Sequence, residues 1–192
     1  MRFSPDDFDT YPGTVSEAAN DRVPCLRFRP GSNGYARFVT RENFIPPIRI
    51  AGWLLPREAN PSPGNRNFDG LHVHVGHVGN GRNYVASLLR RDQGAKINVE
   101  YGWRGYQNLR STSNPLRWAA IRSGTGPELV FERLYHFHVD WLEDEIHTFL
   151  GNEAGTWEMH ASIPKKYRIP FGSAGFRLDS LNVLGNFTVR EL

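Results

Sequence analysis

Hydrophobic and polar residues alternate with a period of two along much of the chain, and Gly, Pro and Asn interrupt this pattern at short intervals. Helical periodicity is nearly absent. Because successive side chains of a strand point to opposite faces of its sheet, the pattern predicts about a dozen short strands in an all-β sandwich or jelly roll. The predicted strands are Leu26–Phe28, Tyr35–Thr40, Ile48–Leu55, Leu71–Val78, Tyr84–Arg90, Lys96–Trp103, Tyr106–Arg110, Leu116–Ile121, Leu134–Leu142, Glu145–Leu150, Thr156–Ile163, Gly175–Leu178 and Asn182–Glu191.

The polar faces of several predicted strands are rich in histidine. In one strand, three aliphatic residues alternate with His72, His74 and Gly76. In two others, aromatic and aliphatic residues form one face, and the opposite face carries His136, His138 and Asp140 in one strand and Asn98, Glu100 and Gly102 in the other. One face of each strand is expected to pack in the core, and the other to carry any chemistry.

Length and composition exclude several classes of protein. The 192 residues, 39% of them hydrophobic and 12% aromatic, predict one folded domain over residues 1–192 rather than a disordered chain. No apolar run is long enough to cross a membrane as a helix. The single cysteine, Cys25, excludes an intramolecular disulfide and a cysteine-based zinc site and is expected to be buried. The acidic first residues do not resemble a secretory signal, so we expect a cytoplasmic protein.

The basic charge rests mainly on arginine. Of 23 Lys and Arg residues only Lys96, Lys165 and Lys166 are lysines, which leaves 20 arginines, and the formal net charge is +3. The arginines form no basic block, so no nucleic-acid partner is expected. A GC-rich genome would produce the same excess without functional meaning.

The segment Leu134–Asn152 resembles the strand–turn–strand hairpin of concanavalin A-like jelly rolls, which include laminin-G-like domains and β-glucanases. Trp141, Asp144 and Ile146 fall in the register of that hairpin, with Gly151-Asn152 where Asp-Gly is usual. Further matches are the opening Asp6-Asp7-Phe8-Asp9, the Tyr84–Arg110 strands, Gly172, Gly175, Phe176 and Arg177, and the last strand with Asn186-Phe187 and Val189. The resemblance implies a concanavalin A-like β-sandwich of two antiparallel sheets. The β-glucanase motif Glu-x-Asp-x-x-Glu is absent, so its two catalytic carboxylates are not transferred.

The resemblance also implies a carbohydrate-recognising domain, which would bind an oligosaccharide, a glycoside or another small molecule in a groove on the concave sheet. The charge pattern and the lack of a long apolar run argue against a nucleic-acid or membrane partner. We expect the groove to gather His72, His74 and Glu100 with Arg177, Arg49 and Trp53. Trp103 and Tyr106, in a turn-like stretch, would add rings at its rim. The sequence does not predict the oligomeric state.

Other interpretations of the same residues remain open. An enzyme of the lyase, glycoside-cleaving or cyclase type would use His72 or His74 with Glu100 as acid and base, and Arg177 to stabilise negative charge. In a structural or adhesion module, Arg177 would pair with Glu100 or Asp179, and most rings would fill the core.

No cofactor is expected, although two kinds of metal site are conceivable. His136 and His138 on one strand face, followed by Glu143, loosely match a His-x-His metal site. A structural calcium would draw oxygen ligands from Asn67, Asp69, Asn80 or Asp179.

Overall fold

The computed structural model describes residues 3–11, 13–31, 35–58, 70–78, 82–90, 96–103, 117–179 and 181–192. Their fold is a sandwich of two antiparallel seven-stranded sheets, as the alternation predicts. The elements are η1 (Pro5–Asp7), β1 (Phe8–Tyr11), β2 (Gly13–Asn20), β3 (Val23–Pro30), β4 (Tyr35–Phe44), β5 (Ile48–Glu58), β6 (Gly70–His77), β7 (Asn83–Arg90), β8 (Lys96–Trp103), β9 (Arg117–Thr125), β10 (Tyr135–Trp141), β11 (Glu145–Asn152), β12 (Gly155–Ser162), η2 (Lys165–Tyr167), β13 (Gly172–Asp179) and β14 (Leu181–Glu191).

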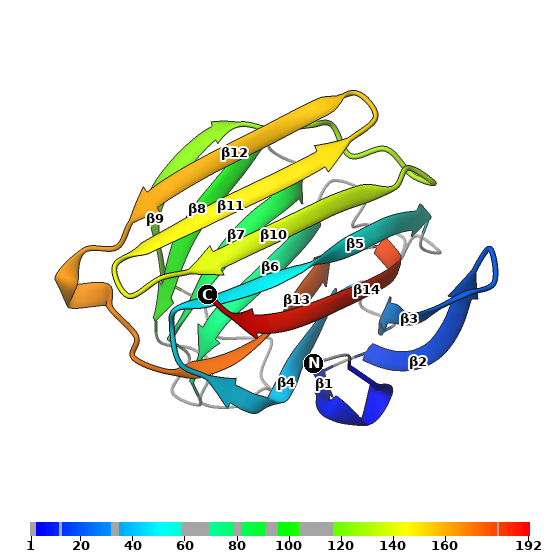
Figure 1. The fold of residues 1–192 in the computed structure, drawn as a ribbon, viewed down its shortest axis with the longest axis horizontal. Helices are drawn as coiled ribbons and strands as arrows, with labels where there is room; N and C mark the ends of the chain where they lie inside the picture. The colour runs from blue at the N-terminus through cyan, green and yellow to red at the C-terminus, as the bar shows by residue number, and fades with distance from the viewer. Residues whose placement is uncertain are drawn as a thin grey trace.

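Strands distant in sequence pair within each sheet. Sheet 1 has the order β1-β4-β13-β6-β7-β8-β9, and sheet 2 has the order β12-β11-β10-β5-β14-β3-β2. Figure 1 looks through sheet 2 onto sheet 1, with the β2–β3 hairpin at the right. In the described part of the chain, no helix is long and apolar enough to cross a membrane.

Aromatic rings from both sheets fill the core between the two layers. Phe28 of sheet 2 meets Phe38 and Phe176 of sheet 1 at centroid distances of 5.2 and 5.3 Å. Phe176 also packs edge-on against Phe187 of β14 at 4.7 Å. Trp141, the expected hairpin tryptophan, is completely buried, and Cys25 is buried as predicted. In strands such as β6 and β10, the inward residues of the predicted alternation therefore supply the packing, and the outward residues remain for other roles.

The first strands were missed by the sequence pattern. Residues 8–11 and 13–20 were not predicted to be strands, yet they form β1 and β2 at one edge of each sheet. Side chains along β2 are only half-buried or exposed, because an edge strand has a neighbour on one side only. A strand with so little buried apolar surface gives a weak alternation signal, and its structure depends on tertiary pairing.

Candidate functional site

The outer face of sheet 1 collects polar side chains from four neighbouring strands. His72 and His74 of β6 lie there as predicted, with Arg177 directly opposite His72 on β13. Arg37 of β4 stands opposite Arg177 on its other side, and Ser87 of β7 opposite His72. The four strands thus align two guanidinium groups and an imidazole in one row across the sheet.

A bulge adds a third histidine to this face. In the pairing of β6 with β13, His74 lies opposite Gly175 and His77 opposite Ser173, so three steps on β6 match two on β13. Gly76, inside the bulge, has φ +64°, a conformation that glycine adopts without strain. The strict alternation expected from sequence would have turned His77 towards the other face. In the structure, His77 instead joins the outer-face polar group.

These polar side chains are shielded from water. Arg37 is only 2% exposed, and His72, His74 and Ser87 are also buried. The Nδ1 atom of His72 lies 2.8 Å from the Ser87 hydroxyl. Desolvation and the nearby Arg37 lower the pKa of His77 to about 4. Burying charged groups is costly, so a buried polar group on the outside of a sandwich is a candidate functional site.

His74 and Asn83 form a hydrogen-bonded pair within this group. The Asn83 side-chain amide donates through Nδ2 to Nδ1 of His74 over 3.0 Å, and both residues are 0% exposed. Burial first, and then the charges of Arg37 and its neighbours, hold the pKa of His74 well below its usual range, so the ring is neutral. Since Nδ1 accepts, the ring proton is on Nε2. In the described part of the structure, neither His74 Nε2 nor Asn83 Oδ1 has a hydrogen-bond partner.

A pocket of about 510 Å³ opens beside this polar group, between the end of β6 and the strands β4 and β13. One wall is polar, and on it Arg41 binds Asp9 at 3.1 Å and the Ser173 hydroxyl donates to the Asn43 side chain at 3.0 Å. His77 connects the pocket with the buried polar group. The lining residues are Asp9, Val39, Thr40, Arg41, Asn43, His77, Val78, Arg82, Ile169, Pro170, Phe171 and Ser173.

The other wall of the pocket is apolar and is held by a buried tyrosine. The Tyr84 hydroxyl donates to the backbone oxygen of Tyr167 at 2.6 Å and accepts from the Ile169 amide at 2.9 Å. These two bonds anchor the segment that carries Pro170 and Phe171. The Phe171 ring is 51% exposed and lies at the pocket. A pocket lined by both an exposed phenylalanine and hydrogen-bonding groups suits a ligand with one apolar and one polar face.

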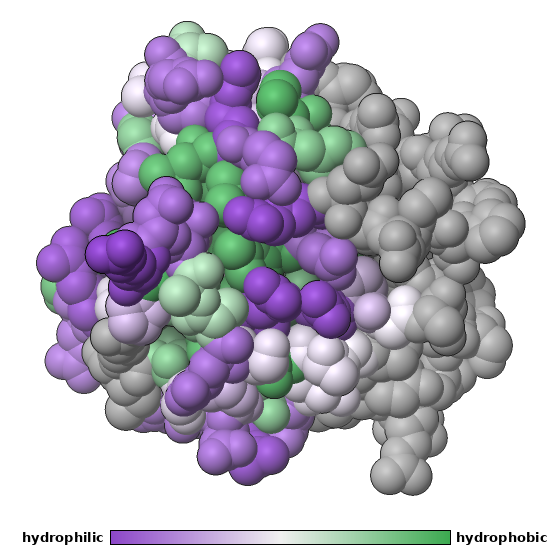
Figure 2. Space-filling model, turned by 90° about the vertical axis from the view of Figure 1, so that its right-hand side faces the viewer, coloured by the Kyte–Doolittle hydropathy of each residue, from purple (hydrophilic) through white to green (hydrophobic). Residues whose placement is uncertain are grey.

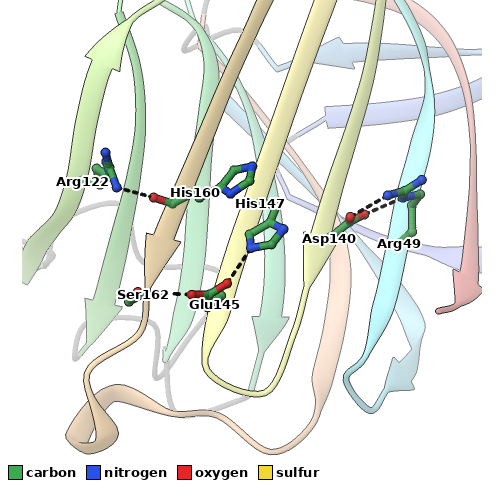
Figure 3. Close-up of polar contacts among 7 residues, drawn as sticks. All are labelled: Arg49, Arg122, Asp140, Glu145, His147, His160 and Ser162. Carbon is green, nitrogen blue, oxygen red and sulfur yellow. Dashed lines mark hydrogen bonds and ion pairs between the residues drawn. The ribbon is translucent and has the colours of Figure 1, made fainter.

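Arg49 and Trp53 lie on the other outer face of the sandwich, so the expectation that they share a groove with His72 is wrong. Both belong to β5 of sheet 2, whereas β6 belongs to sheet 1. Arg49 makes a bidentate ion pair with Asp140, its register partner on β10, at 2.5 and 2.6 Å (Figure 3). This pairing raises the pKa of Arg49. One sequence cannot show which sheet a strand joins, and that assignment separates these residues from the histidines.

Trp53 packs in a small apolar cluster on the outer face of sheet 2. Its neighbours are Ala18, Cys25, Leu55 and Leu184. The cluster includes strands β2 and β3, which lie at the right of Figure 1. Figure 2 views the molecule from that side, where hydrophobic surface is bordered by hydrophilic surface. Trp53 is half-buried here and contributes to packing of this face.

The remaining histidines also lie on the outer face of sheet 2. His147 and His160 stack at 4.0 Å, and His147 Nε2 lies 2.7 Å from a Glu145 carboxylate oxygen (Figure 3). His138 stacks on Phe149 at 4.9 Å. Within the described ranges, no group of three or more His, Cys, Asp or Glu side chains is placed to hold a metal ion, so the grouping of His136, His138 and Glu143 is not formed.

Several predicted site residues lie outside the described structure. Tyr106 and the calcium candidates Asn67, Asp69 and Asn80 fall in undescribed segments. The side chains of Glu100, Trp103 and Asp179 are likewise not described, although their backbones lie in strands of sheet 1. The pairing of Arg177 with Glu100 or Asp179 and the catalytic role of Glu100 therefore stay predictions.

Sequence reasoning missed Asn83, His77 and Phe171. Asn83 directly precedes the predicted strand Tyr84–Arg90, and the signal available for it was its period-two alignment with Val85 and Ser87 on one face. His77 depends on the bulge, for which Gly76 was the only local sign. Phe171 precedes β13 in a segment whose exposure depends on the anchor at Tyr84.

Comparisons with known proteins place the fold. No model of a known protein family matches the chain, and no curated protein matches it. Solved structures do match over nearly the whole length. Carbohydrate binding module CBM66 from Bacillus subtilis has a TM-score of 0.64 and 12% identity, covering 96% of each chain. A Bacillus subtilis protein of unknown function with a galectin-like fold has a TM-score of 0.68 and 13% identity, covering 97% of this chain and 90% of that one. The winged bean acidic lectin complexed with methyl-α-D-galactose has a TM-score of 0.59 and 8% identity, covering 100% of this chain and 99% of that one.

These likenesses confirm the concanavalin A-like fold expected from the resemblance. Two antiparallel sheets in a jelly-roll sandwich are shared with a carbohydrate-binding module and with lectins. Identities of 8–13% concern the fold alone. The function has to be argued from the site.

Proposed function

We propose that the protein binds carbohydrate on the outer face of sheet 1, in the pocket lined by His77, Arg41 and Phe171. The observation that carries the proposal is the composition of that pocket. A half-exposed phenylalanine, an amide, a hydroxyl and an ion pair all line the same pocket.

This arrangement matches the chemistry of a sugar ring. A pyranose has an apolar face of C–H groups, which stacks on an aromatic ring, and a rim of hydroxyls, which bond to amide and hydroxyl side chains. The fold supports the same interpretation, because a lectin of this fold is complexed with methyl-α-D-galactose. An oligosaccharide or glycoside is therefore the expected ligand class.

Titration of the purified protein with D-galactose, D-glucose, D-mannose, D-fructose and their common disaccharides tests the proposal. At least one of these should bind, and Phe171→Ala should weaken that binding about 2- to 10-fold through the lost ring contact. Val23→Ala is the matched control, since Val23 is 53% exposed on sheet 2. The proposal fails if none of the sugars binds, or if Phe171→Ala binds as tightly as Val23→Ala.

A further inference from the structure

Three arginines share the outer face of sheet 2, on the side opposite the pocket. Arg27 and Arg29 lie on β3 on either side of Phe28, whose ring is in the core, so both side chains point outward. Arg57 lies on β5 and pairs in register with Asn182 of β14. Strands β5, β14, β3 and β2 follow one another across the sheet (Figure 1). The sheet therefore gathers arginines that form no basic block in the sequence.

The strand pairings place these side chains within reach of one another. Leu184 of β14 lies opposite both Arg27 of β3 and Leu55 of β5, so Arg29 and Arg57 lie in the next row of the same face. Two strand spacings of about 10 Å separate β3 from β5, and two residues on one face of a strand are about 7 Å apart. Long arginine side chains span such distances, so the three guanidinium groups can contact one ligand.

The positive charge of this arginine group is largely uncompensated. In the part of the chain that the structure describes, neither Arg27 nor Arg29 has a carboxylate partner, and Arg29 is exposed. Arg57 contacts Glu132 at 3.5 Å through Nη2, but its side chain is 43% exposed and its Nε atom has no hydrogen-bond partner there. Because like charges repel, an anion bound between these side chains would stabilise them.

Strand β2 places hydroxyl groups, and no acid, beside the arginine group. Thr14 lies opposite Arg29 and Ser16 opposite Arg27, and the side chains of Thr14 and Ser16 are exposed. Glu17 follows Ser16 and therefore points to the other face of the sheet. Guanidinium forks bind oxyanions such as carboxylates through two parallel hydrogen bonds, and hydroxyl side chains bond to sugar hydroxyls. The face thus combines the groups that recognise an acidic sugar.

We propose that the arginine group is a second ligand site, which binds the acid groups of an anionic glycan, a chain whose sugars carry carboxylate or sulfate. Three arginines in a compact patch match a few acid groups, whereas a nucleic acid carries one charge per nucleotide and needs a longer basic stripe. The arginine excess of the sequence gains a local role in this way. Because the group and the pocket lie on opposite outer faces, this site does not depend on the proposed function.

Titration with defined oligosaccharides tests the proposal. A galacturonate hexamer carries carboxylates, a heparin hexasaccharide carries mainly sulfates, and maltohexaose is a neutral chain of the same length. At least one of the two acidic chains should bind to the wild type more tightly than maltohexaose. Its affinity should fall as the salt concentration is raised, because salt screens exposed charges.

Variants of the arginine group locate the site. Arg27→Gln/Arg29→Gln should weaken binding of the acidic chain about tenfold or more. Arg27→Lys/Arg29→Lys keeps the charge but loses the fork, so its affinity should lie between those of the wild type and the glutamine variant, and it tests the site if the glutamine variant does not fold. The matched control, Lys165→Gln/Arg190→Gln, removes two charges from exposed positions outside the group and should change the affinity less than about twofold.

The outcomes separate a specific site from a general effect of charge. The proposal is overturned if neither acidic chain binds, if the control variant loses as much affinity as Arg27→Gln/Arg29→Gln, or if a single-stranded hexanucleotide binds as tightly as the acidic glycans. Acidic-chain binding that persists in Phe171→Ala supports a site separate from the pocket. Its loss in that variant would place the acidic chain in the pocket and would also overturn the proposal.

Discussion

His77 lies directly opposite Ser173 in the pairing of β6 with β13, although His74 and Gly175 are also opposite each other in the same pairing. The extra residue on β6 is accommodated by Gly76 at φ +64°. Through this bulge, His77 lies on the same face as His74 and reaches the pocket. The local backbone of one glycine therefore shapes the proposed site.

Replacement of Gly76 should damage both the fold and the site. A Cβ atom there would lie 3.0 Å from Trp141 Cζ2, and the left-handed conformation adds strain. We expect Gly76→Ala to lower the unfolding free energy by about 1–2 kcal/mol in urea titrations and to weaken sugar binding. Gly155→Ala is the control. Gly155, the first residue of β12, has φ +151°, and a Cβ there would make only an ordinary contact with the Trp157 ring at 3.9 Å, so stability should fall without loss of binding. Equal binding by both variants would contradict the role of the bulge.

Tyr84 should support the apolar wall of the pocket. Tyr84→Phe leaves the Tyr167 oxygen and the Ile169 amide without their partner. We expect a loss of about 1–3 kcal/mol in unfolding free energy, and weaker sugar binding because the Phe171 segment is released. Calorimetric titration combined with thermal unfolding measures both effects.

The control for Tyr84 is Tyr135, which makes an equivalent double contact in sheet 2. Its hydroxyl donates to the Glu128 oxygen at 2.9 Å and accepts from the Val130 amide at 3.1 Å. Tyr135→Phe should cost similar stability and leave sugar binding unchanged. If both variants bind equally well, the anchor is not needed for the site.

The buried histidines should make stability depend on pH. The pKa of His77 falls from 6.5 to about 4 on folding, so between these values the unfolded chain binds more protons. The contribution of His77 to the unfolding free energy is therefore fully present above pH 6.5. It is lost as the pH falls towards 4, which lowers the unfolding free energy by about 3 kcal/mol for His77 alone. His74, whose pKa is also lowered, adds a loss of the same sign. Urea titrations from pH 7.5 to 4 measure the slope. His77→Gln should flatten it, and His160→Gln, exposed on sheet 2, should not; a slope unchanged in His77→Gln would refute the assignment.

The ion pair between Arg49 and Asp140 should matter for stability alone. The two side chains are 27% and 9% exposed on the outer face of sheet 2. Asp140→Ala leaves Arg49 without its carboxylate and should cost about 1–3 kcal/mol. Because this face is opposite the pocket, affinity for sugars should not change. A loss of sugar affinity in a folded Asp140→Ala protein would return Arg49 to the candidate binding residues.

The alternation in the sequence was sufficient to predict an all-β sandwich and the outward direction of His72, His74 and Arg177. A strand buried on one face must repeat every two residues, and this local rule survives in a single sequence. Trp141 was placed in the core for the same reason, since it continues the alternation of its strand. Cys25 is buried as expected, but in the small cluster with Leu55 and Leu184, which no alternation predicted.

Only the tertiary structure decided which outward residues meet. Arg49 and His72 are both outward polar residues of strands in which polar and apolar residues alternate. Yet β5 joins sheet 2 and β6 joins sheet 1, so the two side chains lie on opposite outer faces of the sandwich. His77 joined His74 through a bulge, and Asn83 met His74 through the pairing of β7 with β6. Strand order and register are set by contacts between segments distant in sequence. The periodicity of one segment fixes the faces of its strand, but carries no information about its neighbours.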